Sequence, residues 1–148
     1  MTTGIIDRID KSIEISASPE RVFALVSEPG WFVNDGTLRP HRMERIGDDL
    51  TIVHDEAHGA FAFRTVELDE PRYAAFRWFA EPNDPDSPST LVEFWITEDE
   101  PGRVTLRVCE TGFAGMPGTD LDRRSRYEDH DGGWTHELGV AKAELERR

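Results

Sequence analysis

The residue with the most chemical promise is Glu110, which continues the apolar side of a strand pattern. In the segment 103–111, Val104, Leu106 and Val108 alternate with polar residues, and Glu110 takes the next position on the same side. A carboxylate there is removed from water, so it must find hydrogen-bond partners or resist ionisation. We therefore expect Glu110 to be a polar anchor in a pocket, or else a strand-end glutamate that reaches solvent or pairs with an arginine.

The other chemistry-bearing residues give weaker signals. His54 and His58 have the three-residue spacing of a metal pair, but that spacing works on a helix, and HDEAHGA has the pattern of a strand end and a turn. His130 and His136 flank the expected start of the last helix among acidic residues, so we expect solvated side chains. Cys109, the one cysteine, excludes an internal disulfide and lies on the outward side of its strand. We expect no metal and no cofactor, and the chain has no GxSxG, P-loop or GxGxxG segment.

Composition limits the partners. The chain has 148 residues with a formal net charge of −13, 37% hydrophobic residues, four Trp and eight Phe. This length and apolar content predict one domain, residues 1–148, with a sizeable core. The negative charge argues against nucleic-acid binding, and no stretch approaches the roughly 20 apolar residues of a membrane span. We expect a cytoplasmic protein, because the first residues lack a secretory signal and the cysteine count suits a reducing compartment. A homodimer stays open.

The order of elements predicts an α+β protein. An alternating strand pattern begins at Ile9, and Ser18-Pro19 starts a short helix that ends at 28–30, with a second short helix or a turn at Trp31-Phe32. Short turns then separate strand-like segments at 42–46, 50–54, 60–68, 73–79, 90–97 and 103–111, which predicts neighbouring antiparallel strands. Residues 114–128 are expected to be irregular. A helix is predicted over roughly 130–147, with Asp131 as its N-cap.

Alternation along the strands predicts which side chains face inward. Pairing Leu68 with Tyr73 across their turn places Arg64 opposite Arg77 on the outer face, and pairing Glu93 with Arg107 places opposite charges there. A one-residue bulge would invert part of this assignment. The inward set is Phe61, Phe63, Phe76, Trp78, Val92, Phe94, Ile96, Leu106 and Val108.

The last helix carries one apolar stripe that must cover this face. Its residues, spaced by a 3.6-residue period, are Trp134, Leu138, Ala141 and Leu145. One helix about 10 Å wide covers few strands, so a curved sheet would leave space for a small molecule. The predicted ligand-binding residues are Phe61, Phe63, Phe76, Trp78, Val92, Phe94, Leu106, Val108, Glu110, Trp134 and Leu138.

Several segments together resemble a known family. The opening IEISASPERVFALVSEP, followed by VELDEPRYAAFRW (66–78), ETGF (110–113) and GGW…L (132–138), resembles the activator-of-Hsp90-ATPase-like family of the START/Bet v 1-like (SRPBCC) superfamily. The resemblance implies a helix-grip fold: a curved seven-stranded antiparallel sheet around a long C-terminal helix, with a hydrophobic cavity between them. It extends only to the C-terminal type of domain of the eukaryotic co-chaperone, so stimulation of Hsp90 is not expected. The family shares no single catalytic constellation.

Three functions follow as hypotheses. The first is a cytoplasmic binding protein that holds a hydrophobic or aromatic small molecule between sheet and helix. The second is an enzyme of the cyclase, dehydratase or hydrolase kind, which needs at least two convergent polar groups in the pocket. The third is a chaperone-accessory or stress-response interaction protein, which needs an exposed apolar patch.

Overall fold

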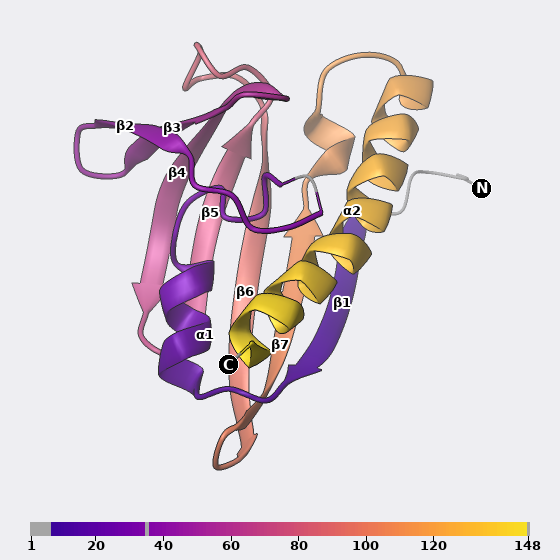
Figure 1. Cartoon of the computed structure of the whole chain (residues 1–148). Coiled ribbons are helices and arrows are strands. Elements are labelled where there is room, and N and C mark those ends of the chain that lie inside the picture. The colour runs from indigo at the N-terminus through magenta and orange to yellow at the C-terminus, as the bar shows by residue number, and fades with distance from the viewer. Residues whose placement is uncertain (1–6, 35, 148) are drawn as a thin grey trace.

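The computed structural model describes residues 7–34 and 36–147, which form one antiparallel sheet with its helices on one face (Figure 1). The strands are β1 (Arg8–Ile15), β2 (Arg42–Ile46), β3 (Leu50–Asp55), β4 (Gly59–Asp69), β5 (Tyr73–Phe79), β6 (Ser89–Glu100) and β7 (Arg103–Thr111). The helices are α1 (Pro19–Val26), the single turn η1 (Phe113–Gly115) and α2 (Asp120–Glu146). The seven strands lie in the order β1-β7-β6-β5-β4-β3-β2, so each expected strand and the predicted α+β class are confirmed.

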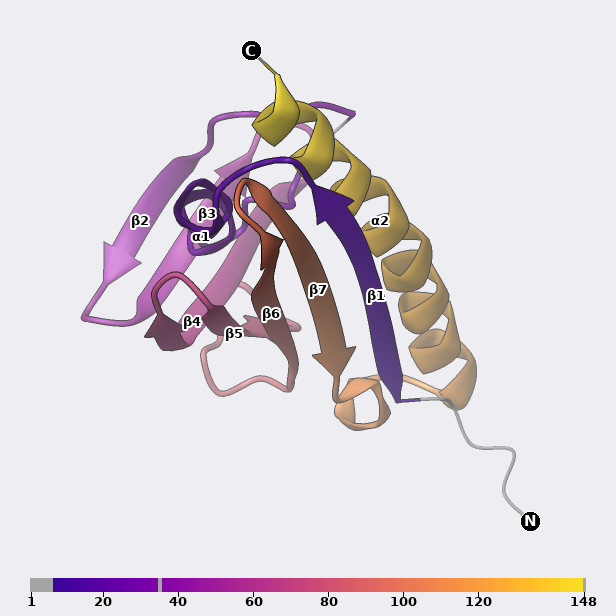
Figure 2. The same ribbon diagram turned by 90° about the horizontal axis from the view of Figure 1, so that it is seen from below.

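Both longer helices cover the same side of the sheet. Helix α2 packs along β1 at one edge, and α1 packs against β5, β6 and β7 (Figure 2). Between them the core is a continuous cluster that includes the aromatic residues Trp31, Phe32, Phe63, Phe94 and Trp134. Within the described ranges, no helix combines the length and the apolarity needed to cross a bilayer.

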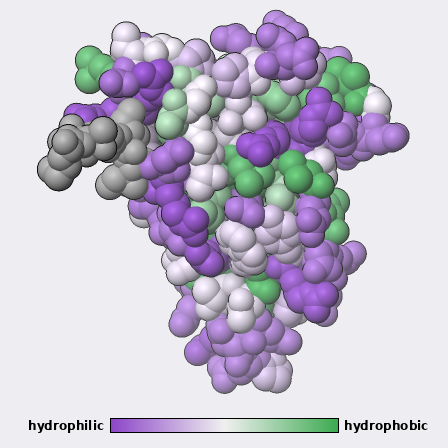
Figure 3. Space-filling model, turned by 180° about the vertical axis from the view of Figure 1, so that it is seen from behind, coloured by the Kyte–Doolittle hydropathy of each residue, from purple (hydrophilic) through white to green (hydrophobic). Residues whose placement is uncertain are grey.

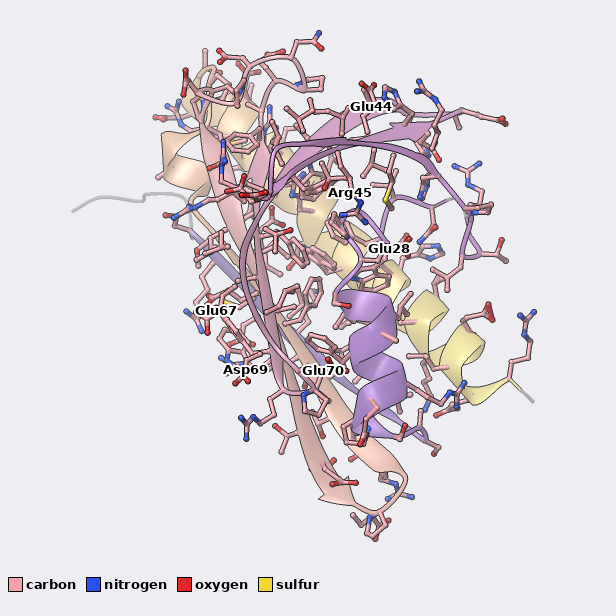
Figure 4. The ribbon with its side chains drawn as sticks, turned by 90° about the vertical axis from the view of Figure 1, so that its left-hand side faces the viewer. Glu28, Glu44, Arg45, Glu67, Asp69 and Glu70 are labelled. Carbon is pink, nitrogen blue, oxygen red and sulfur yellow. The ribbon has the colours of Figure 1, made fainter. Side chains whose placement is uncertain are left out.

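The opposite face of the sheet is predominantly hydrophilic (Figure 3). Glu67 and Asp69 project from β4 on the side turned away from α1 (Figure 4). On the same face Tyr73 donates its hydroxyl hydrogen to Glu93 Oε2 at 2.5 Å. Burial, reinforced by this carboxylate, raises the pKa of Tyr73 well above its usual range. The charged residues of this face therefore support the sheet and keep it solvated.

The expected second short helix after the first strand is absent from the described residues, and turns replace it. Ser18 caps α1 as predicted, its Oγ accepting the Arg21 N–H at 3.2 Å. After the helix, Gly30 takes a left-handed φ of +73°, and a Cβ there would come within 2.9 Å of Val53 Cγ2. The turns direct both Trp31 and Phe32 into the core, where each is at most 6% exposed. The left-handed Gly30 lies outside right-handed helical geometry directly before Trp31, which explains why turns stand there.

Helix α2 begins ten residues earlier than predicted, at Asp120. Thr119 is the N-cap: its Oγ1 accepts the Asp122 N–H at 3.1 Å, and Asp122 Oδ2 accepts the Thr119 N–H at 2.9 Å. This capping box starts the helix inside the segment expected to be irregular, and Asp131 lies within the helix and not at its cap. The first turns of α2 are polar and exposed, so they lack the apolar stripe that predicts the remainder of the helix from the sequence.

Two predicted strand registers are wrong by small shifts. Arg64 does pair with Arg77, but Tyr73 pairs with Asp69 and not Leu68, because a bulge at Val66 absorbs one residue. On β7, Arg107 lies opposite Trp95 and Glu93 opposite Cys109. The inward side of β7 and of β4 up to Thr65 is unchanged, and beyond the bulge Glu67 and Asp69 face outward. The expected Glu93–Arg107 pair is replaced by a cation–π contact at 4.9 Å between Arg107 and Trp95, and by hydrogen bonds from Arg107 to Asp10 on β1.

Candidate functional site

A buried carboxylate forms the centre of the candidate site. Glu110 lies on β7 opposite Val92 of β6, faces the helices and is fully buried. Its Oε2 accepts the Thr90 hydroxyl at 2.6 Å, its Oε1 accepts Trp134 Nε1–H at 2.8 Å, and both oxygens lie 2.9 Å from His130 Nδ1. The inward placement predicted for Glu110 is therefore confirmed, and the carboxylate is held by three side chains from two elements.

His130 connects this carboxylate to a pocket. It lies one helical turn before Trp134 on α2, and its ring stacks on Trp78 at 4.5 Å with an interplanar angle of 17°. The side chain is 16% exposed, so the prediction of a solvated histidine is wrong. A carboxylate only accepts hydrogen bonds, so Nδ1 carries the hydrogen, and Nε2 is the ring nitrogen that offers a lone pair whenever the ring is neutral. Glu110 thus sets both the tautomer and the orientation of the imidazole.

The pocket itself lies between the turn after α1, strand β5 and helix α2. It has a volume of about 140 Å³ and is lined by Phe32, Trp78, Asp129, His130, Gly133, Trp134 and Glu137. An apolar cavity of about 150 Å³ holds a benzene-sized molecule, whereas pockets for drug-sized ligands have about 300–1,000 Å³. Aromatic side chains fill most of the remaining space under α2, with Phe32 only 4.7 Å from Trp134 and 5.2 Å from Trp78, centroid to centroid.

Glu137 forms a second acidic position on the pocket wall. It is 8% exposed, and its Oε1 accepts Asn34 Nδ2–H at 2.8 Å. The same amide group donates to the Trp31 carbonyl at 2.7 Å, so Asn34 ties the turn after α1 to helix α2. Burial raises the pKa of Glu137, and the hydrogen bond from Asn34 offsets part of this effect.

The predicted ligand-binding residues separate into two groups. Trp78 and Trp134 line the pocket, and Glu110 lies directly behind it. The remaining members are packed in the core, Phe61 only partly buried, and their contact with a ligand stays a prediction: Phe61, Phe63, Phe76, Val92, Phe94, Leu106, Val108 and Leu138.

Sequence reasoning missed four functional candidates: Phe32, Asn34, His130 and Glu137. The signal for His130 was present, because it lies four residues before Trp134 on the buried stripe once the helix is extended to Asp120. Phe32 and Asn34 lie in turns, where no periodicity shows which way a side chain points. Glu137 falls off the apolar stripe that contains Trp134 and Leu138, so the helical period gives no sign of its burial.

A second cluster of charged residues lies around Asp55, at the end of β3. Arg39 donates to both Asp55 oxygens at 2.7 and 2.9 Å, and His41 Nε2 lies 3.1 Å from Oδ1. Burial alone raises the pKa of Asp55, but the N–H groups of His58 and Ala57 and the Arg39 guanidinium outweigh it and lower the pKa below the usual value. This cluster has the character of a loop anchor.

Neither metal nor thiol chemistry finds support in the described part of the chain. His54 contacts Glu44 at 2.6 Å, and within residues 7–34 and 36–147 no group of three or more His, Cys, Asp or Glu is arranged to hold a metal ion. Cys109 is buried, and burial raises the pKa of its thiol.

The sheet that grips α2 and the pocket beneath the helix define a START-like, helix-grip protein. Consistent with this, the model of the family described as activator of Hsp90 ATPase homolog 1-like protein matches residues 16–146, so the chain belongs to that family. A search of curated proteins found no match.

Solved structures share the fold at low sequence identity. A START superfamily protein from Mycobacterium smegmatis has a TM-score of 0.62 at 16% identity, covering 94% of this chain and 99% of its own. The Aha1 dimer from Colwellia psychrerythraea has a TM-score of 0.65 at 19% identity, with 94% and 96% covered. DynU16, a protein of the dynemicin biosynthetic locus, has a TM-score of 0.67 at 20% identity, covering 96% of this chain and 48% of its own.

Proposed function

We propose that this protein binds a small molecule, about the size of one aromatic ring, in the pocket beneath α2. The observation that carries the proposal is the composition of the wall: Phe32, Trp78 and Trp134 surround a space of about 140 Å³ onto which His130 and Glu137 open. Apolar walls with a few placed polar groups are typical of ligand sites. The family resemblance, which implies an apolar cavity between sheet and helix, supports the same proposal.

The test uses two adjacent glycines of α2. Gly133 lines the pocket and Gly132 does not, and a Cβ built on either meets no atom within 4 Å. Neither has a positive φ. Gly133→Leu therefore fills the pocket without a backbone clash, and Gly132→Leu is the matched control. Each replacement also removes a helical glycine, which favours the helix by up to about 1 kcal/mol.

The measurement is the melting temperature in the presence of single-ring compounds, including benzyl alcohol, benzylamine and benzoate. We expect at least one compound to raise the melting temperature of the wild type and of Gly132→Leu, but not of Gly133→Leu. If no compound stabilises the wild type, or if Gly133→Leu responds as strongly as Gly132→Leu, the proposal is wrong.

One observation favours a second candidate, an enzyme that uses His130 as a general base. His130 and Glu137 both line the pocket, which gives the two polar side chains that such catalysis requires. The carboxylate behind the imidazole has the orienting role seen in acid–base triads. Hydrolysis of p-nitrophenyl acetate tests this candidate. His130→Ala should abolish any rate above background and His136→Ala, an exposed histidine of the same helix, should not. Equal rates for both variants would exclude it.

A further inference from the structure

Among the polar atoms of the pocket-lining residues, free acceptors outnumber free donors, of which the Trp78 Nε1–H is one. The Trp134 N–H, the one indole donor near Glu110, is already used by that carboxylate. His130 Nε2, Glu137 Oε2 and the Asp129 carboxylate have no hydrogen-bond partner among residues 7–34 and 36–147, although all three residues line the pocket. A ligand that satisfies this wall must therefore bring hydrogen-bond donors.

The charge on the wall is negative. Across the described ranges, no lysine or arginine lies within ion-pair distance of Asp129 or Glu137, whereas other acids such as Asp10, Asp49 and Asp55 have one. Glu137 is 8% exposed, accepts one hydrogen bond from the Asn34 amide, and has His136, the preceding residue, as the basic side chain whose charge acts on it. A buried carboxylate in this state is costly to ionise, and a cation in the pocket would remove that cost.

The rest of the pocket is suited to a cation as well. Three aromatic rings, those of Phe32, Trp78 and Trp134, line the same small space. Aromatic rings attract cations through the negative potential of their faces, most strongly where water is excluded. The net charge of −13 adds a long-range attraction for positive ligands.

We infer that the ligand is a small primary amine bound in its protonated form, an inference that rests on the proposed binding function. The ammonium group would donate its N–H bonds to Glu137 Oε2 and His130 Nε2, and the hydrocarbon part would lie against Trp78, Trp134 and Phe32. The volume of about 140 Å³ limits that part to roughly one ring or a short chain.

Isothermal titration calorimetry at neutral pH tests the inference with three probes of one shape: benzylamine, benzyl alcohol and benzoate. We expect benzylamine to bind at least about tenfold more tightly than benzyl alcohol, because one charge-assisted hydrogen bond is worth that much or more. Benzoate should not bind. Glu137→Gln should reduce benzylamine affinity at least tenfold and leave benzyl alcohol nearly unchanged.

The matched control is Glu128→Gln, which changes the net charge equally on the same helix at an exposed position outside the pocket. If Glu128→Gln reduces the affinity for benzylamine as much as Glu137→Gln does, only the overall charge matters and the inference is wrong. If benzyl alcohol or benzoate binds as tightly as benzylamine, the amine inference is overturned while the binding function stands. If none of the three binds at millimolar concentration, both are overturned.

Discussion

The replacement of Glu110 gives the sharpest test of the buried network. Glu110→Ala leaves Thr90, His130 and Trp134 without their acceptor, and each was hydrogen-bonded at 2.6–2.9 Å in a site that water does not reach. An unsatisfied buried donor costs about 1–3 kcal/mol, and the removed side-chain atoms add a cavity. We expect a loss of roughly 4–6 kcal/mol, a large share of the 5–15 kcal/mol typical of whole proteins.

Glu110→Gln should be far milder, because the amide oxygen can take over as the acceptor. Trp134 Nε1 can only donate, so it requires the amide oxygen at the Oε1 position. The amide nitrogen then faces Thr90 Oγ1, which rotates to accept. His130 Nδ1 lies 2.9 Å from the Oε1 position as well, so its hydrogen can still be donated to the amide oxygen and the tautomer is kept. We expect a loss of about 1–3 kcal/mol in stability.

Urea denaturation followed by circular dichroism measures the stabilities, and ¹⁵N chemical shifts of the imidazole report the tautomer. Glu98→Gln, at an exposed position on β6, is the control for loss of one negative charge and should remain within about 0.5 kcal/mol of the wild type. The reasoning is refuted if Glu110→Ala loses less than about 1 kcal/mol, or if Glu110→Gln loses as much stability as Glu110→Ala.

Three further predictions concern packing and pH. Leu138 lies on the buried side of α2 and is 3% exposed, so Leu138→Ala should lower the free energy of unfolding by roughly 2–5 kcal/mol in urea titrations. A loss near zero would show that the helix does not pack as described. The folded-state pKa of Asp55 is lowered, so its carboxylate stabilises the fold at pH values above its unfolded pKa of 3.8, and this stabilisation is lost as the pH falls through the folded-state pKa. In Asp55→Asn the free energy of unfolding should therefore depend less on pH over that acid range. Burial raises the folded-state pKa of Glu137, so the free energy of unfolding of the wild type should fall as the pH rises from 4.5 through that raised pKa. If the free energy of unfolding of Glu137→Gln falls in parallel with that of the wild type over this range, the assignment is wrong.

Much of the architecture follows from patterns that a sequence carries locally. Alternation along 90–97 and 103–111 identified the inward side of β6 and β7 correctly, and the stripe through Trp134 and Leu138 identified the covering helix. These predictions hold because burial on one face imposes a period of two on a strand and 3.6 on a helix. Glu110 belongs to the same class, since its position in the alternation was enough to place it on the inward side.

Register and the beginning of α2 depended on contacts that periodicity does not encode. The bulge at Val66 shifts the pairing of β4 with β5 at the turn end, near Tyr73, and leaves the Arg64 end as predicted. Sequence alternation at the Arg64 end is therefore compatible with either register at the turn. The capping box at Thr119 starts a polar helix whose first turns are exposed and carry no apolar stripe. Local hydrogen bonds determine the residue at which such a helix begins, and the hydrophobic pattern does not show it.

The pocket was decided by tertiary structure alone. Its wall combines Phe32 from a turn after α1, Trp78 from β5, and His130 and Glu137, which lie about two turns apart on α2. The sequence separates Phe32 from Glu137 by about a hundred residues, and only the packing of α2 over the sheet brings them together. The alternation along 103–111 placed Glu110 on the inward side, and the sequence left open whether its carboxylate stays inside or reaches solvent at the strand end. Which donors surround it, and which acceptors remain free for a ligand, depends on side-chain geometry that exists only once the chain is folded.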